Sequence, residues 1–436
     1  MTVAPERRRA PPKDARMKSA RIARLIVSLV VLAAASMAAA YLLYRMSGGN
    51  EIADDVVTLT RMVRDPFVLW RDYRAAGFSD NWGSFPPLLP PVFSILVAPW
   101  LRIAGDFWGF RLGVLSWTIA ALFALDALLR RTGGIPEERR RGLLLLFVLL
   151  PSVLGAIALI PQEEIYVSLF AAALYAAAAA KRWRLAPPLL LAAVLAGKYF
   201  LLILAVPLAL YSPAPRRNLL AWGALCAAAL GAYVGYHRIA HGLAPIVSHD
   251  IGPGWGVSLW ALLWNAGFQP APRLVRILSL ACVAVFAAVF AMRSRREGRP
   301  LVFSVSGTIV GTLLLLSLAT PGYILWAAPL LPVAVGLMKR RAHRVWSIVL
   351  LFAWGVGEWG ANFFRGVALA LGADRPAGKE TVAALAERLL GRGFPFALAH
   401  IGFLCLVLAA GCGLLYLLST APAEEEAFGR RGVNQP

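Results

Sequence analysis

Acidic residues are scarce in this chain: 23 Asp and Glu stand against 44 Lys and Arg, which gives a formal net charge of +21. The basic residues form no aromatic-interleaved stripe, and no known nucleic-acid reader motif accompanies them, so nucleic acid is not the expected partner. They occur instead in short clusters between apolar runs. This distribution is typical of residues that fix the topology of a membrane protein.

Several signatures of soluble enzymes are also missing. The chain has no Walker loop, no GxSxG elbow, no HExxH pair and no dinucleotide fingerprint between a strand and a helix, so no soluble nucleotide cofactor is expected. Strand-like alternation of apolar and polar residues is absent as well, which favours helices. The few cysteines lie inside apolar segments without metal-ligand spacing and are expected to act as small hydrophobic residues: Cys226, Cys282, Cys405 and Cys412.

Long apolar runs dominate what is present. Hydrophobic residues make up 59% of the chain and the mean hydropathy is +0.67. A soluble core cannot bury so many apolar runs, so they predict an all-α polytopic membrane protein with about 10–13 transmembrane helices, some re-entrant or broken. Residues 25–420 are expected to form a single transmembrane domain between two cytoplasmic tails, a basic one at 1–24 and another at 421–436.

The basic clusters predict which loops face outward. They are assigned to the cytoplasm, and they occupy residues 130–141, 181–184, 216–217, 293–299 and 339–344. Three outer loops follow from this assignment: residues 45–90, which carry juxtamembrane helices, residues near 240–272 and residues near 369–394.

Two stretches do not fit a simple crossing of the membrane. Residues 88–104 are few and rich in proline, whereas residues 187–211 could form one helix although both ends are expected in the cytoplasm. We predict a half-length or re-entrant helix for the first stretch and a fold back at Gly197-Lys198 for the second. Broken helices in a membrane are covered by protein or line a cavity, so both should border the functional pocket.

Carboxylates gather in the first outer loop. Glu51, Asp54 and Asp55 recur at helical spacing on a predicted amphipathic surface helix. A carboxylate beside a region of low dielectric has a raised proton affinity, so Asp54 or Asp55 could accept a proton from a sugar hydroxyl or bind a metal. A solvated acidic face on a surface helix explains the same spacing, and that alternative stays open.

Other charged residues interrupt the apolar runs. The turn at Gln162, Glu163 and Glu164 contains two acids, which need water, a metal or a cation between apolar spans. Lys198 is a lone cation in the apolar run 189–210. Lys198 is thus a candidate ligand of a lipid phosphate or a partner of Glu163 or Glu164 in an ion pair.

Three further polar residues are weaker candidates. Arg238 lies at a helix end from which it could reach a phosphate, and His249 next to Asp250 could move a proton, although a hydrogen-bonded loop is the alternative. Glu358 is a further candidate whose default interpretation is a polar contact within the helix bundle.

Four segments carry a family resemblance by their order along the chain. They are WGSFPPLLPP (82–91), PQEEIYVSLFAAALY (161–175), AGKYFLLILAVPLAL (196–210) and TPGYILWAAPLLP (320–332). In this order they resemble the polytopic, polyprenol-phosphate-sugar-dependent mannosyltransferases of the glycosyltransferase C superfamily. Phe85 stands where this family has tyrosine, Gly322 where glutamine is usual, and the loop lacks an Asp-x-Asp.

The resemblance implies an inverting glycosyltransferase at the non-cytoplasmic face of the plasma (inner) membrane. It would move a hexose, mannose foremost, from a polyprenyl-phosphate donor to a lipid-linked or glycan acceptor. The early loop acid falls on Asp54, with Asp55 beside it, and the phosphate-facing lysine on Lys198, which Arg238 could assist. We expect substrate contacts from Gln162, Glu163, Glu164, Tyr199, His249 and Tyr323.

Cofactor and rival functions stay open at this point. No cofactor is required by the sequence, and a divalent cation held by Asp55 and Glu163 is an alternative. A multi-span transporter or a flippase for lipid-linked glycans is the alternative function, because broken helices and an intramembrane lysine also mark substrate pathways.

Overall fold

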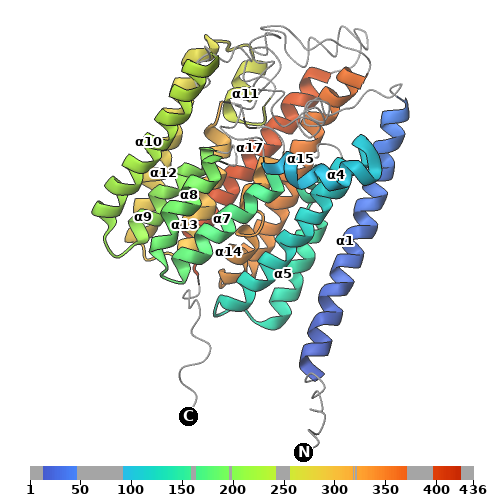
Figure 1. Ribbon diagram of the computed structural model, residues 1–436, viewed down its shortest axis with the longest axis horizontal. Helices are drawn as coiled ribbons and strands as arrows, with labels where there is room; N and C mark the ends of the chain where they lie inside the picture. The colour runs from blue at the N-terminus through green and yellow to red at the C-terminus, as the bar shows by residue number, and fades with distance from the viewer. Residues whose placement is uncertain are drawn as a thin grey trace, which may run out of the picture.

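The described part of the chain is a helical bundle with the features of a membrane protein. The computed structural model describes residues 13–46, 92–158, 164–195, 199–241, 256–317, 319, 322–370 and 396–423. These residues contain α-helices, short 3-10 helices and no strand, only an isolated antiparallel bridge between Met338 and Ala423 (Figure 1). Within the described ranges, five helices are long and apolar enough to cross a membrane: Ile22–Leu42, Phe107–Arg131, Glu137–Ala158, Pro272–Arg296 and Leu398–Thr420. The protein is therefore an all-α polytopic membrane protein, as predicted.

The helices follow the predicted apolar runs along the chain. The first half contains α1 (Lys13–Met46), α4 (Val92–Arg131), α5 (Glu137–Leu149), α6 (Pro151–Ala158), α7 (Glu164–Ala179), η1 (Trp183–Leu185), α8 (Ala186–Leu195), η2 (Tyr199–Leu204), α9 (Ala205–Tyr211) and α10 (Pro215–His241). The second half contains α11 (Leu259–Asn265), α12 (Pro272–Arg296), α13 (Leu301–Leu315), η4 (Tyr323–Ala327), α14 (Leu331–Leu337), α15 (Arg341–Ala370) and α17 (Phe396–Thr420). Helix α1 begins at Lys13, so it extends into the predicted basic tail.

The half-length helix predicted within residues 88–104 ends at Gly105, as far as the described residues from Val92 onward show. This residue has φ 73° and ψ −178° inside α4, a conformation that glycine adopts without the steric cost of a Cβ. The part of α4 before Gly105 lies across the bundle, and the part after it runs along the bundle (Figure 1). The first part is thus a half-length helix rather than a crossing.

The kink in α4 brings two stretches of its own backbone close together. A Cβ on Gly109 would lie 2.6 Å from the Cα of Leu101, a backbone atom that cannot move aside cheaply. We expect Gly109→Ala to destabilise the protein by about 1–3 kcal/mol through overpacking. Thermal unfolding in detergent measures this effect.

Gly142 in α5 provides the matched control for this substitution. A Cβ there would meet nothing within 4 Å, so Gly142→Ala should be neutral or slightly stabilising. Equal unfolding temperatures for Gly109→Ala and Gly142→Ala would contradict the close approach within α4.

The centre and the perimeter of the bundle differ in exposure. Every described residue of η4 and α14 is buried, as are residues 301–314 of α13. The outer helices instead present apolar side chains outward, for example Val31, Val285 and Val349, which are 61%, 64% and 46% exposed. This arrangement suits a bundle whose outer faces contact lipid chains.

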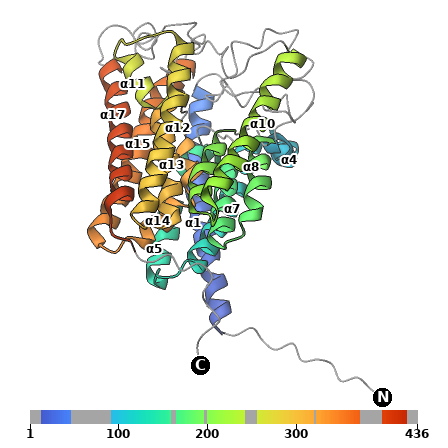
Figure 2. The same ribbon diagram turned by 90° about the vertical axis from the view of Figure 1, so that its left-hand side faces the viewer.

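The basic clusters meet at one end of the bundle, which we call the basic end. Arg139 donates to the carbonyl oxygen of Gly336 at 2.7 Å, and Arg299 donates to that of Ala421 at 3.1 Å. The first residues of α1 and the last residues of α17 lie at this end as well (Figure 2). The helix ends that lead into the three predicted outer loops lie at the opposite end.

Candidate functional site

Most predicted site residues fall outside the described part of the chain. Those outside it are Asp54, Asp55, Gln162, Glu163, Lys198 and His249. Glu164 begins α7, Tyr199 begins η2, and Arg238 lies in the last turn of α10. Tyr323 is described fully: it is 8% exposed and begins η4.

Three central helices are too short to cross a bilayer. Helix α7 follows the segment 159–163, α8 precedes the segment 196–198, and α13 precedes the segment 318–322. Helix α7 has 16 residues, α8 has 10 and α13 has 15, so they extend about 24, 15 and 22 Å at 1.5 Å per residue. The apolar layer is about 30 Å thick. Helices α8 and α13 follow basic clusters and α7 precedes one, so with these clusters at the cytoplasmic surface, as predicted, the helices would end before the opposite surface.

Aromatic rings join η2 and η4, the two 3-10 helices that follow the second and third of these segments. Phe200, two residues after Lys198, stacks on Trp326 with ring centroids 6.1 Å apart, and Tyr323 stacks on the same indole at 4.6 Å. Trp326 is 2% exposed. The elements η2 and η4, which begin at Tyr199 and Tyr323, therefore meet, although the chain separates them by more than a hundred residues.

A buried carboxylate fixes the turn before Tyr323. Glu358 of α15 is 0% exposed, and its Oε2 accepts a hydrogen bond from Ser152 Oγ at 3.0 Å. Its Oε1 accepts a hydrogen bond from the backbone N–H of Gly322. Gly322 has φ 93°, a left-handed conformation that glycine tolerates best. The polar contact within the bundle expected for Glu358 thus connects α15, α6 and the turn at Gly322.

Arg111 is a buried cation that the sequence patterns above do not single out. It is 1% exposed in α4, its Nε donates to the carbonyl oxygen of Ala158 at 2.8 Å, and its Nη1 donates to that of Phe107 at 2.9 Å. The guanidinium carbon lies 3.6 Å from the centroid of the Phe107 ring. Ala158 ends α6, so Arg111 brings positive charge next to the segment 159–163. The available signal was a lone arginine within a membrane-length apolar run.

These groups define what the arrangement can do chemically. A desolvated guanidinium suits a phosphate, and a stack of aromatic rings offers an apolar surface. Among the described residues no group of three or more His, Cys, Asp or Glu could hold a metal ion. The predicted metal ligands Asp55 and Glu163 lie outside those residues, so a metal there stays a prediction.

Comparison with known proteins gives no relative of this chain. No protein-family model, no curated protein and no solved structure matches it. The fold alone therefore defines the class, a polytopic helical membrane protein whose central helices are shorter than the bilayer.

Proposed function

We propose that the protein is a membrane glycosyltransferase that moves a hexose, mannose foremost, from a polyprenyl-phosphate donor to a hydroxyl of a lipid-linked or glycan acceptor. The observation that carries this proposal is the meeting of the motif segments. Residues 196–210 and 320–332 are joined through Phe200, Trp326 and Tyr323. The segment 161–175 begins close to Ala158, the residue that Arg111 contacts.

The short central helices support a site for a lipid-linked donor. Their ends remote from the basic end would lie within the depth of the membrane, where a polyprenyl chain could reach them from the lipid. Basic residues are retained on the cytoplasmic side, so this site would face the non-cytoplasmic side of the plasma (inner) membrane. Long outer helices would cover the broken elements, as the bilayer requires.

The proposed reaction is a single displacement with inversion. Asp54 takes the proton from the acceptor hydroxyl, whose oxygen attacks the anomeric carbon, while the bond from that carbon to the phosphate oxygen breaks. Lys198 and Arg238 would stabilise the negative charge of the leaving polyprenyl phosphate, and Arg111 would add to the positive potential. Gln162, Glu164, Tyr199, His249 and Tyr323 are the proposed substrate contacts.

Asp55 and Glu163 have a separate place in the proposal. Asp55 is a second candidate base beside Asp54, and Glu163 is a substrate contact. Together they would bind a divalent cation if the reaction needs one, since carboxylate oxygens are the ligands that Mg²⁺ and Mn²⁺ prefer.

A transporter or flippase for lipid-linked glycans is the second candidate. The observation that favours it is the presence of Arg111 and Glu358 inside apolar helices, because intramembrane charges often mark substrate pathways. Both side chains bind backbone groups of neighbouring elements, which is also what structural contacts do. Transfer and transport predict different products, so the two candidates can be separated.

The test uses purified protein in liposomes with a radiolabelled hexose on polyprenyl phosphate and a lipid extract as acceptor. We expect the label to appear in a new lipid or glycan product, and no incorporation from a nucleotide-linked hexose. Product analysis by chromatography measures the outcome. Recovery of unchanged donor in the opposite leaflet would favour the transporter, and incorporation from the nucleotide-linked hexose alone would refute the proposed donor.

A further inference from the structure

A cavity of about 580 Å³ opens at the basic end, away from the proposed donor site. The ends of α9, α12 and α14, the start of α13 and the residues after α17 line it. Lys339 and Arg299 supply its positive charges, and Glu297 supplies its carboxylate. The volume lies within the range of about 300–1,000 Å³ that is typical of sites for small molecules.

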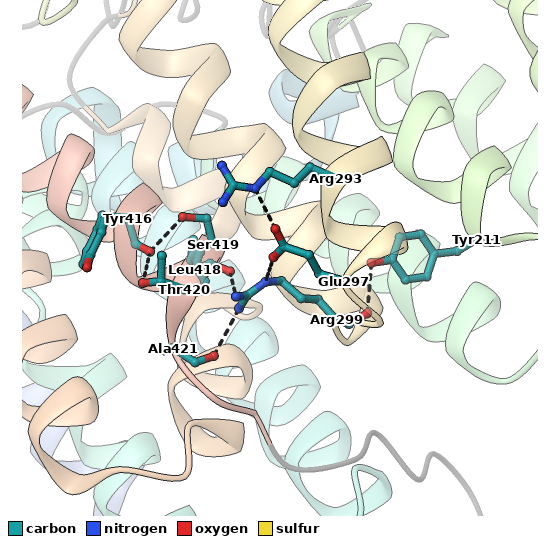
Figure 3. Close-up of polar contacts among 9 residues, drawn as sticks. All are labelled: Tyr211, Arg293, Glu297, Arg299, Tyr416, Leu418, Ser419, Thr420 and Ala421. Carbon is teal, nitrogen blue, oxygen red and sulfur yellow. Dashed lines mark hydrogen bonds and ion pairs between the residues drawn. The ribbon is translucent and has the colours of Figure 1, made fainter.

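Arg299 is held in place before any ligand arrives. Its Nε donates to Glu297 at 2.9 Å, and its Nη1 donates to the carbonyl oxygens of Leu418 and Ala421 at 3.3 and 3.1 Å (Figure 3). Its own carbonyl oxygen accepts a hydrogen bond from Tyr211 Oη at 2.9 Å. A side chain fixed in this way loses little conformational entropy when it binds an anion.

Glu297 does not cancel the positive charge of this region. Arg293 and Arg299 both donate to its carboxylate, at 2.7 and 2.9 Å. These hydrogen bonds, first that of Arg293 and then that of Arg299, hold the pKa of Glu297 below its usual value. The carboxylate is therefore ionised and already matched by two guanidinium groups.

Lys339 adds a cation that has no protein partner within the described residues. Its backbone N–H donates to the carbonyl oxygen of Pro422 at 2.9 Å, which fixes the base of the side chain. The side chain itself is exposed and lines the cavity, and exposed Arg340 and Arg341 follow it. The cavity thus combines one guanidinium held by hydrogen bonds with one exposed ammonium.

Aromatic residues near the ends of α15 and α17 indicate that the basic end lies at the headgroup level of a bilayer. Trp346, in the second turn of α15, is 60% exposed, and Tyr416, in the last two turns of α17, is 65% exposed. Exposed Trp and Tyr near helix ends commonly lie at the membrane–water interface. Phosphates of membrane lipids occupy this level, and basic pockets between transmembrane helices bind them.

We propose that this cavity binds the phosphate group of an anionic phospholipid headgroup. A free phosphate ion offers the same chemistry to Arg299 and Lys339, so the experiment below separates the two sources. The site lies at the end of the bundle opposite the proposed donor site and does not depend on glycosyl transfer. A bound phosphate group would bridge residues next to the ends of α12, α14 and α17 and so stabilise their packing.

The test measures the unfolding temperature of the purified full-length protein in neutral detergent. Phosphatidylglycerol, phosphatidylcholine with the same acyl chains, and inorganic phosphate are titrated in separate arms. We expect phosphatidylglycerol to raise the unfolding temperature and phosphatidylcholine to leave it unchanged. If inorganic phosphate alone raises the unfolding temperature as much as phosphatidylglycerol does, the cavity binds free phosphate. If inorganic phosphate has no effect, the cavity binds the lipid.

Lys339→Gln is the decisive variant because its ammonium has no protein partner in the described residues, so the fold should survive its loss. We expect the half-saturating concentration of phosphatidylglycerol to rise about fivefold, as for one basic side chain near an anionic group. Arg184→Gln removes an equally exposed cation from another basic cluster and should leave it unchanged. Equal responses of the two variants, or equal shifts with both lipids, would overturn the proposal.

Discussion

Replacing Asp54 by asparagine is expected to lower kcat for hexose transfer by at least about 100-fold, with little change in KM for the polyprenyl-phosphate donor. Asparagine has nearly the same shape as aspartate but cannot accept a proton, and loss of a general base costs about 10²–10⁴ in rate. Donor binding would persist because it rests on cations and aromatic rings. Initial rates with purified protein in liposomes measure both constants.

Neighbouring acids provide the controls for this substitution. Glu51→Gln changes another carboxylate of the same predicted helix face and should leave the rate within about twofold, since surface changes of this kind perturb little. If Asp55→Asn lowers the transfer rate and added Mn²⁺ restores it, the reaction uses a divalent cation. Full transfer by Asp54→Asn would refute its role as base and leave the solvated helix face as the explanation of the acidic loop.

Local sequence patterns predict the membrane-crossing elements and several of their breaks. The proline-rich stretch 88–104 predicts a half-length helix, and α4 bends at Gly105. The run 187–211 predicts a break at Gly197-Lys198, and the structure has α8 end at Leu195 and η2 begin at Tyr199. These features depend on nearby residues, which is why the sequence alone indicates them.

Two apolar stretches are interrupted in the structure. Glu137–Ala158 is long enough to cross a membrane, but Leu150 within it has an extended backbone and α6 begins at Pro151. The residue before a proline is disfavoured in the helical region, so a local signal was present. Residues 322–338 form η4 and α14 rather than one helix, and Pro329 and Pro332 are the local signal for this break.

The contacts of the candidate site depend on residues that are far apart in the chain. Ser152 and Glu358 are separated by 206 positions, and Arg111 and Ala158 by 47. Apolar periodicity shows that these helices enter the membrane but contains no information on which helix packs beside which. Arg111 could have been found as a lone intramembrane cation, whereas its partners could not.

Glu358→Leu is expected to destabilise the protein by about 2–5 kcal/mol. Leucine fills most of the volume but leaves the backbone N–H of Gly322 and the hydroxyl of Ser152 buried without their acceptor, at about 1–3 kcal/mol for each group. The turn that precedes Tyr323 would lose its attachment to α15. Unfolding in detergent titrated with a denaturing surfactant measures the loss.

Glu358→Gln is the matched control because an amide can keep both hydrogen bonds. Its oxygen can accept from Gly322, and its NH₂ group can donate to Ser152 Oγ, which accepts as readily as it donates. Ser152→Ala removes one of the two contacts and should cost about 1 kcal/mol. Stability of Glu358→Leu equal to that of Glu358→Gln would show that the carboxylate does not hold the turn. If the proposed function is right, transfer activity should fall with Glu358→Leu and persist with Glu358→Gln, because Tyr323 and its stack on Trp326 depend on the position of Gly322.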